Sequence, residues 1–309
     1  MKLEVNVRGR IGRILVVLLL ATPIVGGHAA AEERGGWKGW TPSLSIAAGI
    51  MSTGKYEGSV SLTDSMGIDQ RDPNSGEDFL TSPIFEVSLG LATPVVLPYD
   101  GRVFVSADLI PVAGFKRNIA SEGADSPLEP PETVNFPASA VAGQGLKTQV
   151  RTNALAWGFT LGVEIPFELG GYDFRVKPAA SWMTFEVDVD GRARYAEKNG
   201  SVTGNTFRAV VMKPSGKIYL NGFGPSLEVE SVGDRFGPFH ASFFARAAGY
   251  RIVGDRTVNM TQFVSFNDAF GIETYEGRWR TRAAKWAYRV NLGVRIHLQP
   301  GRGGTDRKK

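Results

Sequence analysis

Apolar and polar residues alternate without a break from Ala283 to Leu298, near the end of the chain. Because successive side chains of a β-strand point to opposite faces, this segment predicts a strand with one apolar and one charged face. An apolar row of this kind faces the core of a soluble sandwich or the lipid around a membrane barrel. The rest of the chain has to decide between these two classes. The row consists of Ala284, Trp286, Tyr288, Val290, Leu292, Val294, Ile296 and Leu298.

Seven earlier segments repeat this alternation, and no helical periodicity persists along the chain after its first 31 residues. In the clearest of them, residues 153–167, every odd position from Leu155 to Phe167 is apolar. The sequence therefore predicts an all-β protein with eight strands. They lie at residues 43–50, 84–97, 102–115, 153–167, 174–182, 222–230, 238–250 and 283–298.

The connections between these segments alternate in length. Short spans of turn-forming residues follow the second, fourth and sixth strands, at residues 98–102, 169–173 and 232–237. Long polar connections follow the other strands, and we expect loops at residues 53–81, 116–145, 192–216 and 264–273. This asymmetry is typical of an antiparallel up-and-down transmembrane β-barrel, which has short periplasmic turns and long extracellular loops.

Two places leave the number and geometry of the strands open. Residues 205–211 lie between two turn-like stretches and read either as the upper part of a membrane strand or as half of an extracellular hairpin, which leaves ten strands possible. The parity of the apolar row also changes between Trp182 and Phe185, which suggests a β-bulge.

The first 31 residues have the pattern of a cleaved secretory signal peptide. Four basic residues precede the apolar run 14–27, and Ala29 and Ala31 are the small residues before a cut at Glu32. The run is shorter than the roughly 20 residues that a spanning helix needs. We therefore expect a signal peptide at 1–31, a periplasmic segment at 32–41, the barrel at 42–298 and a periplasmic tail at 299–309.

Charge and cysteine content narrow the function further. The chain has 35 Lys and Arg against 31 Asp and Glu, but four of the basic residues and one acid belong to the leader, which leaves 31 and 30. A nearly neutral chain without a basic run does not fit a nucleic-acid partner. Cysteine is absent, which excludes disulfides, thiolate metal sites and a catalytic cysteine.

Aromatic residues bracket apolar rows whose length suits a tilted strand crossing the hydrocarbon layer of a bilayer. Amphipathic rings favour the headgroup level, so two aromatic girdles are expected around the barrel. Core aromatics of a soluble sandwich are the alternative. The candidate girdle residues are Trp157, Phe167, Tyr172, Trp182, Trp286 and Tyr288.

Near the end of the chain, Asn291, Gly293, Ile296 and Leu298 resemble the C-terminal targeting signal of bacterial outer-membrane proteins. That signal usually ends on an aromatic residue at the last position, whereas this chain continues for eleven residues after Leu298. The mature chain resembles small eight-stranded outer-membrane barrels. The resemblance implies location in the bacterial outer membrane and contact with its lipid and lipopolysaccharide. It also implies the barrel-assembly machinery and periplasmic chaperones as partners during biogenesis.

If the apolar rows face lipid, the charged rows face the lumen. An eight-stranded barrel leaves an interior that side chains can nearly fill, so inward charges must pair with one another. The near balance of acids and bases favours a lumen plugged by salt bridges and a structural or surface-interaction role. Because many other inward residues are Ala, Gly or Ser, a narrow porin-like diffusion channel is the alternative. The predicted lumen charges are Glu86, Asp108, Glu164, Arg175, Lys177, Glu228, Glu230, Arg246, Lys285, Arg289 and Arg295.

The sequence offers little catalytic chemistry. It has no zinc-ligand cluster, phosphate-binding glycine loop or G-x-S-x-G elbow, so we expect neither a metal nor a cofactor, and no enzyme. After the leader only His240 and His297 remain, both on inward parity beside the short turns. We expect them to bond Glu228 or Glu230 at the rim, with a periplasmic acid/base pair as the alternative.

Overall fold

The computed structural model describes residues 39–64, 69–122, 145–198, 207–236, 238–268 and 271–298. The predicted leader and C-terminal tail lie outside these residues. From Thr41 onward the chain forms one compact all-β antiparallel unit, which confirms the predicted fold class. The described residues contain no helix long and apolar enough to span a membrane. The strands are β1 (Thr41–Thr63), β2 (Asp69–Ala92), β3 (Arg102–Pro111), β4 (Arg117–Glu122), β5 (Gly145–Thr152), β6 (Leu155–Leu169), β7 (Tyr172–Lys198), β8 (Phe207–Met212), β9 (Ser215–Phe236), β10 (Phe239–Val253), β11 (Thr257–Asp268), β12 (Gly271–Arg282) and β13 (Trp286–Leu298).

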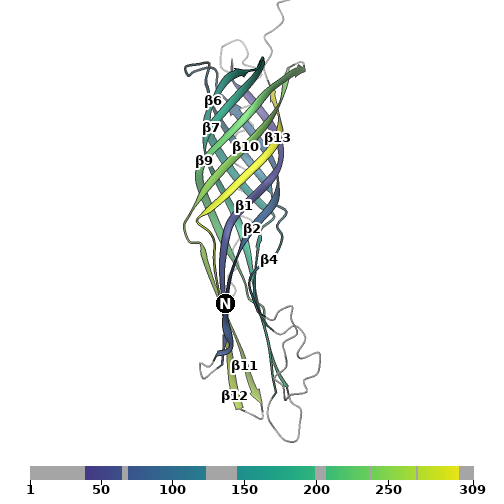
Figure 1. The fold of residues 1–309 in the computed structure, drawn as a ribbon, viewed down its shortest axis with the longest axis vertical. Helices are drawn as coiled ribbons and strands as arrows, with labels where there is room; N and C mark the ends of the chain where they lie inside the picture. Colours follow the sequence, from purple (N-terminus) through teal and green to yellow (C-terminus); the bar gives the residue numbers. More distant parts are fainter. Residues whose placement is uncertain are drawn as a thin grey trace, which may run out of the picture. The chain divides into compact units, whose positions relative to one another are not determined.

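Eight of these strands close a ring in the order β1, β13, β10, β9, β7, β6, β3 and β2, with β2 paired back to β1 (Figure 1). Each overlaps one of the eight segments that the alternation predicts, but some of these segments run beyond their strands, as residues 93–97, 112–115 and 283–285 do. Leu44 of β1, for example, lies opposite Ile296 of β13 on one side and Leu89 of β2 on the other. Closure leaves no unpaired edge along this part of the sheet.

Short turns connect the ring strands at one end, which we call the turn end. Gly170 and Gly171 join β6 to β7 with φ angles of +64° and +81°, as a two-residue hairpin turn requires. Tyr99 and Asp100 also adopt positive φ in the connection from β2 to β3. The turn between β6 and β7 lies within the predicted residues 169–173. The connection from β2 to β3, in contrast, begins earlier than the predicted residue 98, because β2 ends at Ala92, and β9 continues through most of the predicted turn 232–237.

Where the structure describes the long connections at the other end, they are mostly strands, and the expectation of polar loops is wrong for those residues. β1, β2, β7 and β9 run on beyond the ring, and five further strands pair around them: β4, β5, β8, β11 and β12. The described residues thus form thirteen strands, not eight or ten. The suggested extra hairpin is present, because β8 pairs with the end of β7. We call this region the extension; its residues 65–68, 123–144, 199–206 and 269–270 lie outside the described part.

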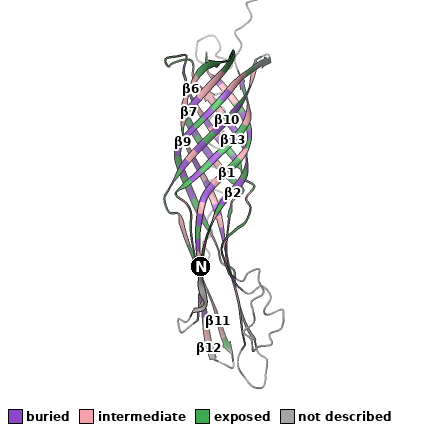
Figure 2. Ribbon diagram, viewed as in Figure 1, coloured by how far each residue is buried: buried purple, intermediate pink, exposed green. Residues whose placement is uncertain are grey.

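The inward and outward faces of the strands exchange polarity between the ring and the extension. In the ring, exposed residues are apolar and buried ones are often charged, as Leu227 and Glu228 illustrate on β9. In the extension most buried residues are apolar and most exposed ones polar, as Ile218 and Lys217 illustrate on β9. Figure 2 shows buried and exposed residues alternating along the ring strands. A single strand therefore passes from one kind of environment into another.

The predicted bulge between Trp182 and Phe185 is wrong. β7 pairs with β9 from Phe174 to Asp190 without a register shift, and Met183 and Phe185 both point inward because the interior at this level is apolar. The irregularity lies in β1, where the register with β2 shifts between Ser52 and Lys55. Gly54 occupies this point with φ +74°, and the shift turns the next apolar residues inward.

The interior of the extension is a hydrophobic core. Trp279 is 1% exposed, and its indole N–H donates a hydrogen bond to the Lys147 carbonyl at 3.3 Å. Gly191 and Gly277 make room for this ring, because a Cβ at either position would lie within 3.0 Å of it. Fully buried aromatic and aliphatic side chains stabilise the extension by roughly 1.5–3 kcal/mol each. The largest are Trp279, Tyr56, Tyr250, Tyr275, Met51, Leu62, Leu80, Ile110, Leu146, Met183 and Met212.

Candidate functional site

Charged side chains converge inside the ring toward its turn end. Five carboxylates and five cations contact one another there, and we call this set, together with His297, the lumen network. The residues directly before and after each member face outward, so the pleat of the strand points each member inward. The members are Glu86, Asp108, Glu164, Arg175, Lys177, Glu228, Glu230, Arg246, Arg289, Arg295 and His297.

Arg246 is the centre of the half of the network nearer the extension. Its Nη1 lies 2.9 Å from Glu86 Oε1 and 3.1 Å from Asp108 Oδ2, and its Nε donates to Glu228 Oε2 at 2.8 Å. Arg289 contacts Glu86 and Asp108 at 3.1 Å each. Both guanidinium groups thus bridge carboxylates from different strands.

Lys177 and Arg295 join the carboxylates in the other half. Lys177 Nζ lies 3.4 Å from Glu164 and 3.3 Å from Glu228, and it also donates to Glu230. Arg295 donates to Glu228, with one bond of 2.9 Å, and to Glu230 at 2.6 Å. Glu228 contacts cations in both halves, so the network is continuous.

Arg175 and His297 complete the network at the turn end. Arg175 lies 3.3 Å from Glu164 and 3.6 Å from Glu230. His297 Nε2 lies 2.5 Å from Glu230 Oε1, which fits the expected rim contact. His240 pairs with His297 across β10 and β13, with ring centroids 6.3 Å apart.

One predicted lumen charge lies elsewhere. Lys285 is exposed, because it precedes β13 in the short segment that joins β12 to β13, and its strand parity does not hold there. The interior at its level is apolar and would not accommodate an ammonium group. Without Lys285 the network contains five carboxylates, four arginines and one lysine, so its formal charges cancel when His297 is neutral.

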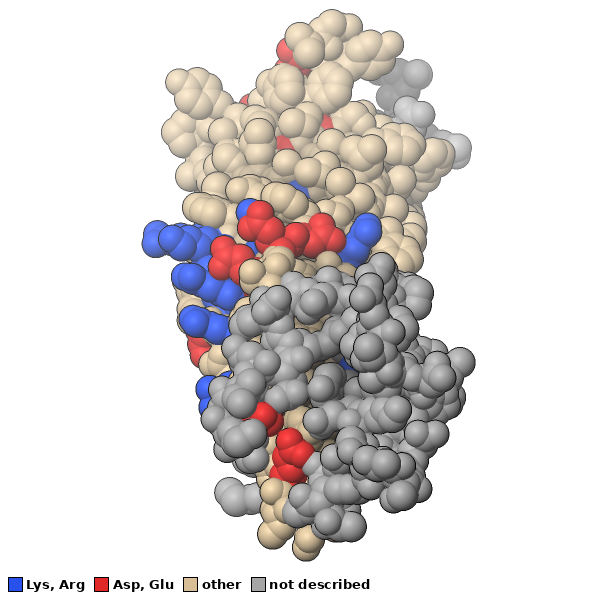
Figure 3. Space-filling model, turned by 60° about the horizontal axis from the view of Figure 1, so that its bottom comes forward, with Lys and Arg blue, Asp and Glu red and all other residues tan. Residues whose placement is uncertain are grey.

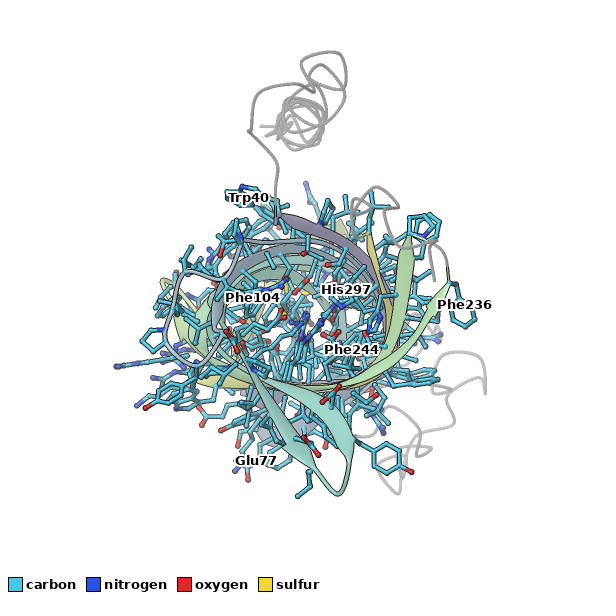
Figure 4. All side chains as sticks on the ribbon, turned by 90° about the horizontal axis from the view of Figure 1, so that it is seen from above. Trp40, Glu77, Phe104, Phe236, Phe244 and His297 are labelled. Carbon is cyan, nitrogen blue, oxygen red and sulfur yellow. The ribbon has the colours of Figure 1, made fainter. Side chains whose placement is uncertain are left out.

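The sequence analysis did not predict several inward residues that contact the network. Arg295 lies over the Phe244 ring at 4.5 Å and Lys177 over the Phe104 ring at 5.5 Å, which adds cation–π attraction. Figure 4 looks along the ring from the turn end and shows Phe104, Phe244 and His297 pointing into it. Asn291, predicted only as part of the assembly signal, donates to Glu86. Their inward parity is the signal that could have found them.

The arrangement around Glu230 is not that of a catalytic triad. Ser242 Oγ donates to Glu230 Oε1 at 2.6 Å, and His297 contacts the same oxygen. An activated serine needs its base within hydrogen-bonding distance, with the carboxylate behind the base. Here both groups are directed at the carboxylate. Among the described residues, no three His, Asp or Glu side chains are placed to hold a metal ion.

Two pockets lie beside the network at the turn end, and the larger, more open one, of about 390 Å³, is lined by Arg175, Glu168 and Asp173. The smaller pocket, of about 20 Å³, lies between Lys177, Arg295 and a wall of small residues on β1, β2 and β3, including Ser45 and Ser88. This is room for about one water molecule. The serine hydroxyls and the charged groups give such a water several hydrogen-bonding partners.

The predicted girdle residues all lie on the outer face of the ring. Near the extension, the Trp157 and Trp182 rings pack edge to face with centroids 4.6 Å apart. At the turn end, Phe167 stacks on Phe174, and Tyr172 is exposed. Trp286 and Tyr288 are also exposed, on β13.

Beyond the ring, the outer surface becomes charged. In Figure 3 a mostly tan surface gives way to a belt of basic and acidic side chains. Three cations there lie beside carboxylates of β7: Lys217 by Glu186, Arg151 by Asp188 and Lys116 by Asp190. The hydrogen bond to Glu186 raises the pKa of the Lys217 ammonium.

Comparison with known proteins identifies no family. No protein-family model and no curated protein matches the chain. Among solved structures, the outer-membrane protease OmpT from Escherichia coli is 12% identical with a TM-score of 0.30, covering 86% of this chain and 99% of that one. Neisserial surface protein A is 8% identical with a TM-score of 0.25, covering 84% and 99%. Ail, the attachment invasion locus protein of Yersinia pestis, is 8% identical with a TM-score of 0.25, covering 83% and 99%.

Proposed function

We propose that this chain is an integral barrel of the bacterial outer membrane with a lumen closed by the lumen network, and that it presents its extension at the cell surface in a structural or interaction role. The observation that carries the proposal is the exchange of inside and outside along single strands. The same β9 exposes Leu227 beside buried Glu228 in the ring, and exposes Lys217 beside buried Ile218 in the extension.

Membrane embedding follows from the outer surface of the ring. Soluble monomers rarely expose apolar patches larger than a few hundred Å². Here large apolar side chains, such as Leu161 at 54% and Leu292 at 66%, are exposed on every ring strand. Lipid acyl chains around the ring would cover this apolar surface. Aromatic residues lie at both ends of the ring, where headgroups are expected.

Closure of the lumen follows from the pairing of charges. A pore that selects for an ion usually has an excess of one sign along its wall. This interior has equal numbers of both signs, and each carboxylate of the network lies within 3.5 Å of a cation. Such a cross-linked interior has little freedom to make way for a solute.

The role of the extension follows from its core. Loops held only by their ends would be mobile, whereas thirty buried apolar residues pack into one cluster that begins inside the ring and fills the extension. The extension would therefore hold its tip at a fixed distance from the membrane. Rigid scaffolds that display loops are a common basis for recognition.

Conductance in a planar bilayer tests closure. We expect the refolded wild-type protein to be silent and Arg295→Ala to conduct, because the substitution removes a side chain that links β13 to Glu228 and Glu230 of β9 inside the lumen. The matched control is Lys116→Ala, which removes one exposed positive charge and should stay silent. Steady conductance by the wild type would overturn the closed lumen and support the alternative, a narrow porin-like diffusion channel.

A further inference from the structure

We infer that four basic residues beside the outer girdle bind the phosphate groups of outer-leaflet lipid headgroups, as in lipopolysaccharide. This inference rests on the proposed membrane embedding and adds a lipid-binding site to it. The residues are Arg251, Arg280, Arg282 and Lys285, which we call the junction cluster.

The junction cluster surrounds the point where β10, β11, β12 and β13 meet. The Ile252 N–H donates to the Lys285 carbonyl at 2.8 Å, and the Ala283 N–H to the Arg256 carbonyl at 2.8 Å. The first bond holds the end of β10 against the segment before β13, and the second joins the residue after β12 to the residue before β11. The side chains of the cluster are all exposed on the outer surface.

The cluster lies just beyond the aromatic residues that mark the membrane boundary. Arg251 is the ladder partner of Trp286, and Lys285 precedes Trp286 in the chain. Arg282 lies across from Glu57 of β1, and Arg280 is two residues farther along β12, roughly 7 Å away. Tryptophan at the headgroup level therefore places the cationic groups among the phosphates and the first sugars outside them.

These cations also lack partners of their own. None of the four forms an ion pair with a residue that the structure describes, whereas Lys116, Arg151 and Lys217 on the β7 side of the extension each do. Two acids lie nearby. Asp255 accepts the Thr257 N–H at 2.9 Å, and Glu57 stands opposite Arg282 without pairing with it. Basic side chains still outnumber acidic ones, so an anion is the complementary ligand.

Guanidinium groups bind phosphate with two parallel hydrogen bonds, and three of the four residues are arginines. Basic residues at an anionic membrane surface each strengthen binding several-fold. A lipid with two phosphates can contact more than one of them at once. The site thus takes phosphorylated lipid headgroups, held by their acyl chains beside Trp286.

The test is titration of the full-length mature protein in zwitterionic detergent with bisphosphorylated lipid A, counting bound lipid by native mass spectrometry. We expect R251Q/R282Q/K285Q to weaken binding by roughly 10- to 100-fold. The matched control, R117Q/R192Q/K213Q, removes three exposed cations of the extension that also have no ion pair with described residues but lie farther from the girdle. It should bind like the wild type.

Three results would overturn the inference: an equal loss in both variants, equal binding of dephosphorylated lipid A by the wild type, or displacement of lipid A by millimolar inorganic phosphate, which would indicate a site for free anions. Insertion of the wild type into phosphatidylcholine vesicles, measured separately by protease protection, tests the membrane embedding. If the protein inserts but the cluster variant binds lipid A normally, only this inference fails.

Discussion

At the scale of single residues, Arg246 reports most directly on charge pairing in the lumen, since it contacts Glu86, Asp108 and Glu228. Replacing it with alanine leaves each of these three buried carboxylates with one cation fewer. Breaking a buried pair costs about 3–5 kcal/mol. We therefore expect Arg246→Ala to lower the free energy of unfolding by that amount, measured by urea unfolding in lipid vesicles.

The control is Lys116→Ala, which removes a cation 2.9 Å from Asp190 on the exposed surface. Exposed pairs contribute roughly 0–1 kcal/mol. Similar losses of stability in the two variants would mean that the lumen is wet and its charges are screened, contrary to the proposed closure.

The alternation of side chains along each strand predicted most of the lumen network from the sequence. If the apolar row of a barrel strand faces outward, the charged residues between its members point into the lumen. The prediction failed for Lys285, because β13 begins one residue after it, at Trp286. The alternation also did not predict which charges pair with one another. Arg289 contacts Asp108, 181 positions away in the chain, because of the order of the strands in the ring. No local pattern encodes that order.

At the scale of the element, the strands of the ring and of the extension should respond differently to an outward charge. Leu161→Arg puts a guanidinium on the proposed lipid face and should cost about 2–4 kcal/mol in vesicles. Tyr219→Arg changes a residue of β9 that is similarly exposed, at 51%, but lies in the extension. It should cost less than about 0.5 kcal/mol, as surface substitutions usually do. Equal costs, measured by urea unfolding, would contradict the assigned membrane boundary.

We expect that the extension can unfold while the ring stays folded. Trp279→Ala removes the largest buried side chain there, and such substitutions cost about 3–5 kcal/mol. Limited proteolysis of the protein in vesicles should then cut the extension while the ring strands stay protected. Thr261→Ala, a change on the exposed face of the neighbouring β11, should leave the cleavage pattern unchanged. Loss of the protected ring fragment in Trp279→Ala would mean that the two regions unfold together.

The extension also shows why its strands read as loops in the sequence. Residues 55–62 alternate as regularly as β13 does, with Tyr56, Val60 and Leu62 buried. Lysine, glutamate and serine on the other row, however, resemble the composition of a solvated loop. The alternation could therefore have predicted a strand. In the extension, however, the apolar row faces inward, because the outer surface meets water there and lipid around the ring.

At the scale of the whole molecule, the two ends of the barrel should face different compartments. The turn end carries short connections and the beginning and end of the strand-forming chain, and exported barrels keep such ends on the periplasmic side. Ser75 lies in the extension, paired with Ser59 of β1, and Asp100 lies in the connection between β2 and β3 at the turn end. Both side chains are exposed.

Because the chain has no cysteine, a single introduced thiol is the only one present. We expect Ser75→Cys to react with a membrane-impermeant maleimide on intact cells, and Asp100→Cys to react only after the outer membrane is permeabilised. Labelling both variants in detergent controls for the reactivity of each thiol. Reaction of Asp100→Cys alone on intact cells would invert the orientation, and the extension would then project into the periplasm. In that case the junction cluster would meet the inner leaflet, which has no lipopolysaccharide, so this measurement should precede the lipid titration.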